Sequence, residues 1–154
     1  MKTKTEPTKC CYQAIVKQVK DGDTIGIDIN LASFSQLREI TPDDWLIDLG
    51  FSLFVSRDFL APILSGTPIW LKGESIRFYG INAPEKNTDA GKESRQFVEA
   101  ILPVDTTITL ETIRVKAKTK QEKYGRYLGR IFLPDERCLN DLLLEQKLAL
   151  PFMV

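Results

Sequence analysis

The 154-residue sequence contains no histidine. This absence excludes imidazole from acid–base catalysis, from Ser-His and Cys-His nucleophile pairs, and from zinc sites that need an imidazole ligand. Proton transfer would therefore fall to a carboxylate, a lysine, a tyrosine or a cysteine. The simplest metal sites that remain are ligated by oxygen atoms.

Cysteine is also scarce, with three residues in the chain. Cys10 and Cys11 are adjacent, which is not a recognised zinc spacing, and neither forms a CxxC pair with Cys138. Adjacent cysteines do not easily bridge to each other. We therefore expect free or buried thiols, as in a reducing compartment.

A net charge and long apolar runs are missing as well. The 21 basic residues balance 21 acidic ones, so no overall field attracts the protein to nucleic acid, and any polyanion site must be local. Residues 1–13 lack the apolar core of a signal peptide, and no apolar run approaches the length of a membrane span. We therefore expect a cytoplasmic protein.

The composition that remains is that of a soluble globular protein, 43% apolar and 27% charged. A chain of 154 residues is long enough for one domain with a hydrophobic core and too short for two ordinary domains. We therefore predict a single domain over residues 1–154.

The spacing of apolar residues predicts an alternation of strands and helices. Strands are expected over 12–20, 24–31, 74–81, 106–115 and 127–133, and amphipathic helices over 90–102 and 139–149. The first two strands flank the turn signal Asp21-Gly22. This order predicts a β-barrel with helices, of the α+β class, and specifically a five-stranded antiparallel OB-fold barrel.

Three short motifs contain the residues with catalytic potential, namely Asp-Gly-Asp-Thr at 21–24, Ile-Arg-Phe-Tyr-Gly-Ile-Asn-Ala-Pro-Glu at 76–85 and Lys-Tyr-Gly-Arg at 123–126. Asp23 begins a strand just after a tight turn, and Arg77 lies midway along a strand expected to end at Asn82. If these two strands pair antiparallel, Asp23 lies near Asn82 and Glu85. The sequence thus predicts one site assembled from distant positions.

The residue types of this site suit hydrolysis of a phosphodiester on a metal. The Asp23 carboxylate and the Asn82 amide oxygen are hard ligands suited to Ca²⁺ or Mg²⁺. Glu85 follows a proline and is a candidate general base for a water molecule. Arg77 and Arg126 can each hold phosphate oxygens and stabilise the charge of the transition state.

A local basic segment supports this interpretation in an otherwise neutral chain. Basic side chains far outnumber acidic ones over residues 111–130, where Lys118 and Lys120 are candidate contacts to nucleic acid and tyrosine rings could stack on bases. Each motif alone has an ordinary explanation, because Asp21-Gly22 is usually only a turn and a lysine-rich hairpin is usually a solvated surface. Their conjunction favours a phosphodiester site.

In these motifs the chain resembles the staphylococcal nuclease (thermonuclease) family, over about residues 15–28 and 76–149. The resemblance implies an OB-fold and Ca²⁺-dependent hydrolysis of DNA or RNA by in-line attack of water, with 3′-phosphorylated products, in an intracellular or phage-type nuclease. It implies metal ligation by Asp23, Asn82 and the backbone carbonyl of Ala83. It also implies that Arg77 and Arg126 bind phosphate, that Glu85 is the base, and that Lys123 and Tyr124 flank the nucleotide.

The sequence departs from the family pattern at the metal site. Asn82 stands where the family more often has aspartate, so one charged ligand has become neutral. Fewer ligand charges weaken Ca²⁺ binding, by roughly one or two orders of magnitude. This departure and the neutral net charge favour an alternative, a catalytically weak or inactive OB-fold module that binds nucleic acid or a protein partner.

The second departure is an insertion at about residues 31–72, where the smallest members of the family have a short connection. This segment has more acidic than basic residues, so it should not face a phosphate backbone. Its aromatic residues suggest either a surface for self-association or a cover over the end of the barrel. They are Phe34, Trp45, Phe51, Phe54, Phe59 and Trp70.

Overall fold

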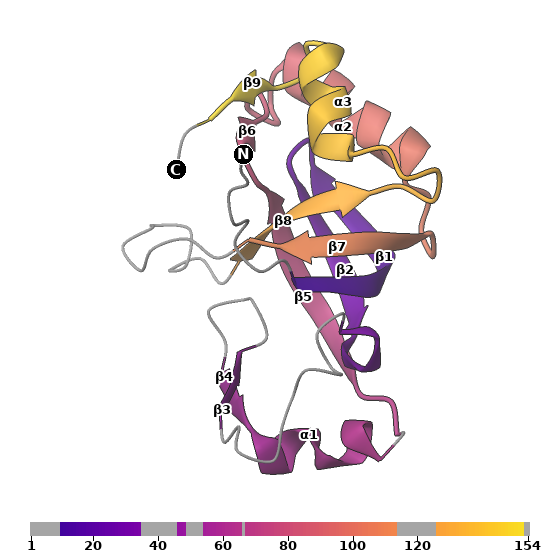
Figure 1. Ribbon diagram of the computed structural model, residues 1–154. Coiled ribbons are helices and arrows are strands. Elements are labelled where there is room, and N and C mark those ends of the chain that lie inside the picture. The colour runs from indigo at the N-terminus through magenta and orange to yellow at the C-terminus, as the bar shows by residue number, and fades with distance from the viewer. Residues whose placement is uncertain (1–9, 35–45, 49–53, 66, 114–125, 153–154) are drawn as a thin grey trace.

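The computed structural model describes residues 10–34, 46–48, 54–65, 67–113 and 126–152. At its centre is a closed barrel of five strands in the order β1-β2-β5-β8-β7 (Figure 1). These strands are β1 (Cys10–Asp21), β2 (Thr24–Asn30), β5 (Trp70–Phe78), β7 (Thr107–Thr112) and β8 (Arg126–Phe132). The barrel and its helices confirm the predicted α+β fold class.

One ladder of the barrel differs from the prediction. β5 and β8 run parallel, whereas the sequence was expected to form an antiparallel barrel throughout. Alternating apolar residues show which face of a strand is buried, but they carry no information on the direction of its neighbour. A parallel pair needs a long connection, and the chain here passes through a helix and β7 between the two strands.

The side chains of β2 show how the barrel core is built. Ile25, Ile27 and Ile29 alternate along the strand and are fully buried, as their spacing predicts. The neighbouring strand β1 is irregular, because its register with β2 shifts after Val16 and again after Val19. β1 pairs with β2 over one part of its length and with β7 over another, and this double pairing closes the barrel.

The predicted strand 74–81 is interrupted at the site. β5 ends at Phe78, Gly80 adopts a positive φ of 83°, and the two-residue strand β6 (Ile81–Asn82) follows. β6 pairs antiparallel with β9 (Leu150–Pro151) and forms a separate small sheet with it. Asn82 therefore belongs to this small sheet and not to the barrel strand that carries Arg77.

Two helices, α2 (Asp89–Ile101) and α3 (Leu139–Glu145), cover one end of the barrel (Figure 1). α2 confirms the helix predicted over 90–102. α3 ends before the predicted Ala149, because Lys147 adopts a positive φ of 60° and the chain then leads into β9. Within the described ranges, no helix is long and apolar enough to cross a membrane.

The buried side chain of Asn140 fastens α3 to the barrel. Its Nδ2 donates to the carbonyl oxygens of Tyr79, at 2.9 Å, and Gly129, at 3.2 Å. Its Oδ1 accepts from the Ile131 N–H at 3.1 Å. One amide thus joins α3, β8 and the turn after β5, whereas the sequence indicated only that Asn140 lies near a helix start.

The predicted insertion contains η1 (Leu31–Ser33), β3 (Leu46–Asp48), β4 (Phe54–Ser56) and α1 (Arg57–Leu64). In Figure 1, β3, β4 and α1 lie at the end of the barrel opposite α2 and α3. β5 begins at Trp70, so the last residues of the range 31–72 are part of the barrel. The extent of the single domain and of its insertion otherwise stays a prediction.

The aromatic residues of this segment do not form one surface. Phe34 is buried and stacks on Tyr12, with ring centroids 5.1 Å apart. Phe59 and Trp70 are 48% and 40% exposed. Trp45 and Phe51 lie outside the described residues, as does the side chain of Phe54. Self-association through residues 31–72 stays a prediction.

Of the described cysteines, Cys11 and Cys138 are in no disulfide bond, in agreement with the sequence analysis. Burial raises the pKa of the Cys138 thiol. The thiol is therefore protonated at neutral pH, and a protonated thiol is a weak nucleophile and a weak metal ligand.

The network of Asn140 generates a prediction for stability. Asn140→Leu has a similar volume but removes the side-chain partner of the Ile131 N–H and of the Tyr79 carbonyl oxygen, and one of the two donors to the Gly129 carbonyl oxygen, so we expect a loss of about 2–4 kcal/mol in the free energy of unfolding. Urea denaturation followed by circular dichroism measures this loss. Glu145→Ala, at an exposed position of the same helix, should change the free energy by less than about 0.5 kcal/mol. Equal effects of both variants would contradict the assignment.

Candidate functional site

Asp23 reaches the site through the pairing of β2 with β5. The two strands are antiparallel with Thr24 opposite Arg77, and the Phe78 N–H donates to the Asp23 carbonyl oxygen at 2.8 Å. The start of β2 therefore lies beside the end of β5, as the sequence analysis predicted. Arg77 lies next to the last residue of β5 and not midway along a longer strand.

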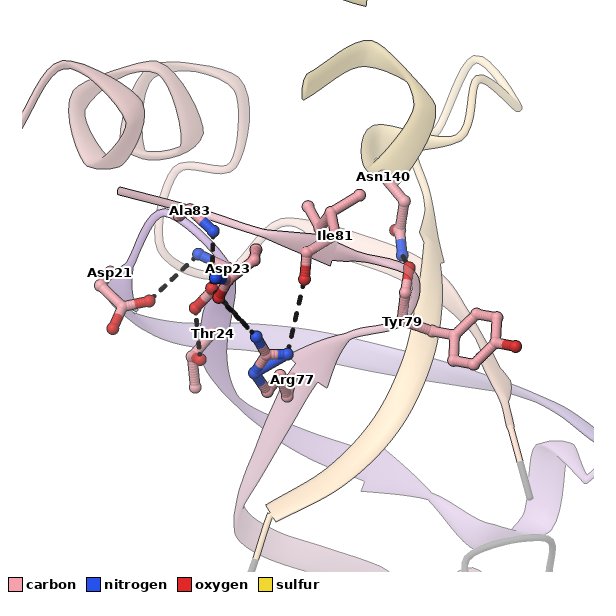
Figure 2. A network of polar contacts seen from close by, with 9 residues as sticks. Asp21, Asp23, Thr24, Arg77, Tyr79, Ile81, Ala83 and Asn140 are labelled. Atoms are coloured by element: carbon pink, nitrogen blue, oxygen red, sulfur yellow. Dashed lines mark hydrogen bonds and ion pairs between the residues drawn. The ribbon is translucent and has the colours of Figure 1, made fainter. Parts of the chain in front are cut away.

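The Asp23 carboxylate joins three segments of the chain (Figure 2). Its Oδ2 accepts from the Ala83 N–H at 2.9 Å, and its Oδ1 accepts from the Thr24 hydroxyl at 3.0 Å. Its Oδ2 also lies 3.6 Å from Nη2 of Arg77. The Asp23 N–H donates to Oδ1 of Asp21 at 3.0 Å, which fixes the turn before β2.

These contacts keep Asp23 ionised although it is buried. Burial by itself would raise the pKa of Asp23, but the contact with Asp21, the Ala83 N–H, the Arg77 charge and the Thr24 hydroxyl together lower it below its ordinary value. Asp23 therefore carries a negative charge at neutral pH.

The Arg77 guanidinium is held on several sides. Its Nη2 donates to Oδ1 of Asn82 at 2.8 Å, and its Nη1 donates to the Ile81 carbonyl oxygen at 3.5 Å. The ring of Phe152 lies 5.2 Å from its central carbon, a cation–π distance. The residue is 7% exposed. Arg77 is thus an internal counter-ion of Asp23 as well as a candidate phosphate ligand.

Glu85 is brought close to this cluster by the chain itself, two residues after Ala83. The residue is exposed. Its carbonyl oxygen accepts from the N–H of Thr88 at 3.0 Å and from the Thr88 hydroxyl at 2.7 Å. Among the described residues, none makes a hydrogen bond or ion pair with the Glu85 carboxylate. This group is therefore open to a water molecule, as a general base requires.

Ala83 contacts Asp23 through its N–H, whereas the predicted contact of this residue involves its carbonyl oxygen. The family resemblance implies that its carbonyl oxygen ligates a metal. The N–H bond at 2.9 Å attaches the loop after β6 to the Asp23 carboxylate. The role of the carbonyl oxygen stays a prediction.

The structure describes the backbone of Arg126. It begins β8 and pairs with Ser75 in the parallel ladder, and Leu128 pairs with Arg77. Positions 77 and 126 therefore belong to adjacent strands and share one face of the sheet. Its side chain lies outside the described part of the chain, as do Lys118, Lys120, Lys123 and Tyr124.

The described oxygens suit a hard cation by their chemistry. Oδ2 of Asp23 and Oδ1 of Asn82 approach the same nitrogen, Nη2 of Arg77, at 3.6 Å and 2.8 Å, so the two oxygens converge on one positive charge. An ionised carboxylate and an amide oxygen are ligands that Ca²⁺ accepts. The described residues contain no cluster of three or more Cys, Asp or Glu side chains that could hold a metal. A cation at this place would have few charged ligands among the described residues.

Several residues that build the site were not identified from the sequence. A Cβ on Gly22 would lie 2.7 Å from Cβ of Ser94, so α2 packs directly on the turn before Asp23. A Cβ on Gly91 would overlap the Glu85 carbonyl oxygen. Thr88 caps α2 by accepting from the Gly91 N–H at 3.0 Å. The threonine was recognisable as a helix N-cap signal, whereas the close approaches of the glycines carry no local signal.

A cavity of about 660 Å³ lies elsewhere, over β1, β7 and the end of β8. Its lining consists of Gln13, Thr107, Ile108, Thr109, Phe132, Leu133, Pro134 and Glu136. None of the predicted site residues is among them. The polar cluster around Asp23 is therefore the better candidate, because it combines a buried charge, a guanidinium and an exposed carboxylate.

Comparison with known families shows to which family the chain belongs. A model of the family described as staphylococcal nuclease homologues matches residues 75–153, about half of the chain. The chain belongs to this family. In this staphylococcal nuclease homologue, the matched range includes Arg77, Asn82, Glu85 and Arg126. Asp23 lies outside the matched range, and the pairing of β2 with β5 brings it beside Arg77. A comparison with curated proteins found no match.

The low pKa of Asp23 generates a prediction for acid stability. Folding lowers the pKa of Asp23. Such a group stabilises the folded protein at a pH above the pKa that it has in the unfolded chain, which is about 4. This stabilisation is lost as the pH falls through the pKa of the group in the folded protein. Asp23→Asn should therefore be less stable than the wild type at pH 7, and the difference should shrink below about pH 4. Urea titrations between pH 2 and about 7 measure it. A difference between Asp23→Asn and the wild type that stays constant over this pH range would contradict the assignment.

Proposed function

We propose that this chain hydrolyses phosphodiester bonds of DNA, RNA or both. The observation that carries the proposal is the convergence of Asp23, Arg77 and Asn82 on one point beside the exposed Glu85. A buried negative charge next to a guanidinium and an exposed carboxylate offers charge stabilisation and a base within one small region. Membership of a family of nuclease homologues supports the same reaction class.

Each residue has a role in the proposed reaction. Glu85 takes the proton of the attacking water, since its carboxylate has no partner among the described residues. Arg77 and Arg126 hold non-bridging phosphate oxygens, with Arg77 exchanging part of its contact to Asn82 for the phosphate. The basic segment extends the contact along the nucleic acid through Lys118, Lys120, Lys123 and Tyr124.

Ca²⁺ is the cation that we propose for this site, in a protein that we expect to be cytoplasmic. Asp23, Asn82 and the backbone carbonyl of Ala83 would hold it. When bound, the ion supplies positive charge beside the phosphate, in addition to the charge of Arg77. Asn82 contributes no charge, and Arg77 competes for the same two oxygens, so we expect the affinity to be low.

The proposed function predicts cleavage that depends on both the metal and Glu85. With single-stranded DNA or RNA and millimolar Ca²⁺, we expect cleavage that EDTA abolishes and that Glu85→Gln lowers by at least about a hundredfold. Gel electrophoresis of end-labelled substrate measures the rates. Glu93→Gln, an exposed position in α2, should cleave like the wild type. Cleavage that survives both EDTA and Glu85→Gln would overturn the mechanism.

A second prediction concerns the missing ligand charge. Asn82→Asp should tighten Ca²⁺ binding by roughly one or two orders of magnitude, because a second carboxylate would face the cation. Titration calorimetry and the Ca²⁺-induced rise in melting temperature measure it. Asn30→Asp makes the same change of net charge at the other end of β2 and should leave Ca²⁺ binding unchanged. Equal effects of the two variants would show that Asn82 is not a ligand position.

The second candidate function is a non-catalytic module that binds nucleic acid or a protein partner. The contacts of Arg77 within the protein favour this function. Its guanidinium contacts four neighbouring residues and the residue is 7% exposed, so few of its N–H groups are accessible to a phosphate. A melting experiment with Ca²⁺ and a nucleoside 3′,5′-bisphosphate separates the two functions. Stabilisation together with cleavage supports the hydrolase, whereas no stabilisation together with no cleavage supports the module.

A further inference from the structure

Three residues on one face of α2 contact different parts of the candidate site. Thr88 is the N-cap of the helix, and Gly91 and Ser94 follow at intervals of three residues, which places them on the same side. Thr88 and Gly91 contact Glu85, while Ser94 packs against Gly22. This face of α2 is therefore a common support for the base and for the turn that carries Asp23.

The contact with the turn before Asp23 is direct. A Cβ on Gly22 would lie 2.7 Å from Cβ of Ser94 and 3.0 Å from Cβ of Ala83. The Ser94 hydroxyl donates to the Leu148 carbonyl oxygen on its other side. Ser94 is fully buried, so α2 cannot shift along the turn without opening this packing. The helix thus has a fixed position relative to Asp23.

The contact with Glu85 is made by backbone hydrogen bonds. The Glu85 carbonyl oxygen accepts from both the N–H and the hydroxyl of Thr88, at 3.0 Å and 2.7 Å. The same hydroxyl accepts from the Gly91 N–H at 3.0 Å, so the helix cap and the anchor of Glu85 share one oxygen atom. Gly91 leaves room for the Glu85 carbonyl, because any side chain there would overlap it.

Among the described residues, only the backbone of Glu85 has polar partners, and these are the N–H and the hydroxyl of Thr88. A general base has to lie within hydrogen-bond reach of the water that it activates, and a displacement of about 1 Å can cost on the order of a hundredfold in rate. We propose that Thr88 is a positioning residue, which holds the Glu85 backbone at a fixed place relative to Asp23 and Arg77 through the Glu85 carbonyl oxygen. This inference rests on the proposed hydrolase function.

The test compares variants of the hydroxyl. Thr88→Val keeps the shape but removes the donor and acceptor, and we expect kcat to fall by at least about tenfold with little change in KM. Thr88→Ser retains the hydroxyl and should restore most of kcat. Thr106→Val is the matched control, since the Thr106 hydroxyl makes a similar bond to the Pro103 carbonyl far from the site, and it should keep wild-type kinetics.

A further variant separates positioning from helix capping. Thr88→Asp still accepts the Gly91 N–H, so α2 remains capped, but its carboxylate has no proton to donate to the Glu85 carbonyl oxygen. We expect a melting temperature near that of the wild type together with a reduced kcat. Wild-type kcat in Thr88→Asp would overturn the role of Thr88, even if Thr88→Val fails to fold.

A double-mutant cycle shows whether Thr88 acts through Glu85. In the Glu85→Gln background, Thr88→Val should cause no further loss of kcat, because the base is already absent. Equal losses in both backgrounds, or no loss in the wild-type background, would overturn the inference alone. A wild-type protein without Glu85-dependent cleavage would overturn the proposed function, and the positioning role with it.

Discussion

The buried negative charge of Asp23 is the constraint on which the site is built. Its carboxylate contacts the Ala83 N–H, the Thr24 hydroxyl and the Arg77 guanidinium, so it fixes the loop after β6, the start of β2 and the end of β5 relative to one another. Removing a partner from a buried charge pair is much more costly than removing a surface pair. The same interaction therefore stabilises the fold and defines the geometry available for chemistry.

The positive charge of Arg77 has two opposing effects at the site. Its charge offsets the burial of Asp23, and its Nη2 approaches the oxygens that would hold a cation. A bound cation would take over the first task and release the guanidinium for a phosphate. Under the proposed function, binding of a metal and binding of phosphate would thus be linked through a single side chain, because two positive groups would compete for the same oxygens.

Most of the barrel could be predicted from the sequence, because alternating apolar residues such as Ile25 and Ile27 reflect burial on one face of a strand. The proximity of Asp23 and Arg77 was also predictable, since antiparallel pairing places the start of β2 beside the end of β5. Asn82 belongs to the separate sheet of β6 and β9, so its place was not given by this pairing. The direction of β8 was not predictable either, because side-chain alternation is the same in parallel and antiparallel ladders.

The contacts of the site residues were less accessible from the sequence. The Ala83 N–H, the carbonyl of Glu85 and the close approach of Gly91 involve backbone atoms, and every residue type has nearly the same backbone. Phe152 reaches Arg77 only because β9 pairs with β6, a match of two residues that leaves no periodic pattern. The chemical groups of the site could be identified from the sequence, but their hydrogen-bond and ion-pair partners could not.

The short sheet of β6 and β9 has a consequence for the order of folding. Asn82 pairs with Leu150, and the ring of Phe152 covers Arg77, so the site joins residues that are far apart along the chain. Contacts of such long range form late and slow the search for the native state, because a large loop has to be closed before they contribute. A nascent chain can form the β1–β2 hairpin early, but it completes the surroundings of Arg77 only after residue 152 has been synthesised.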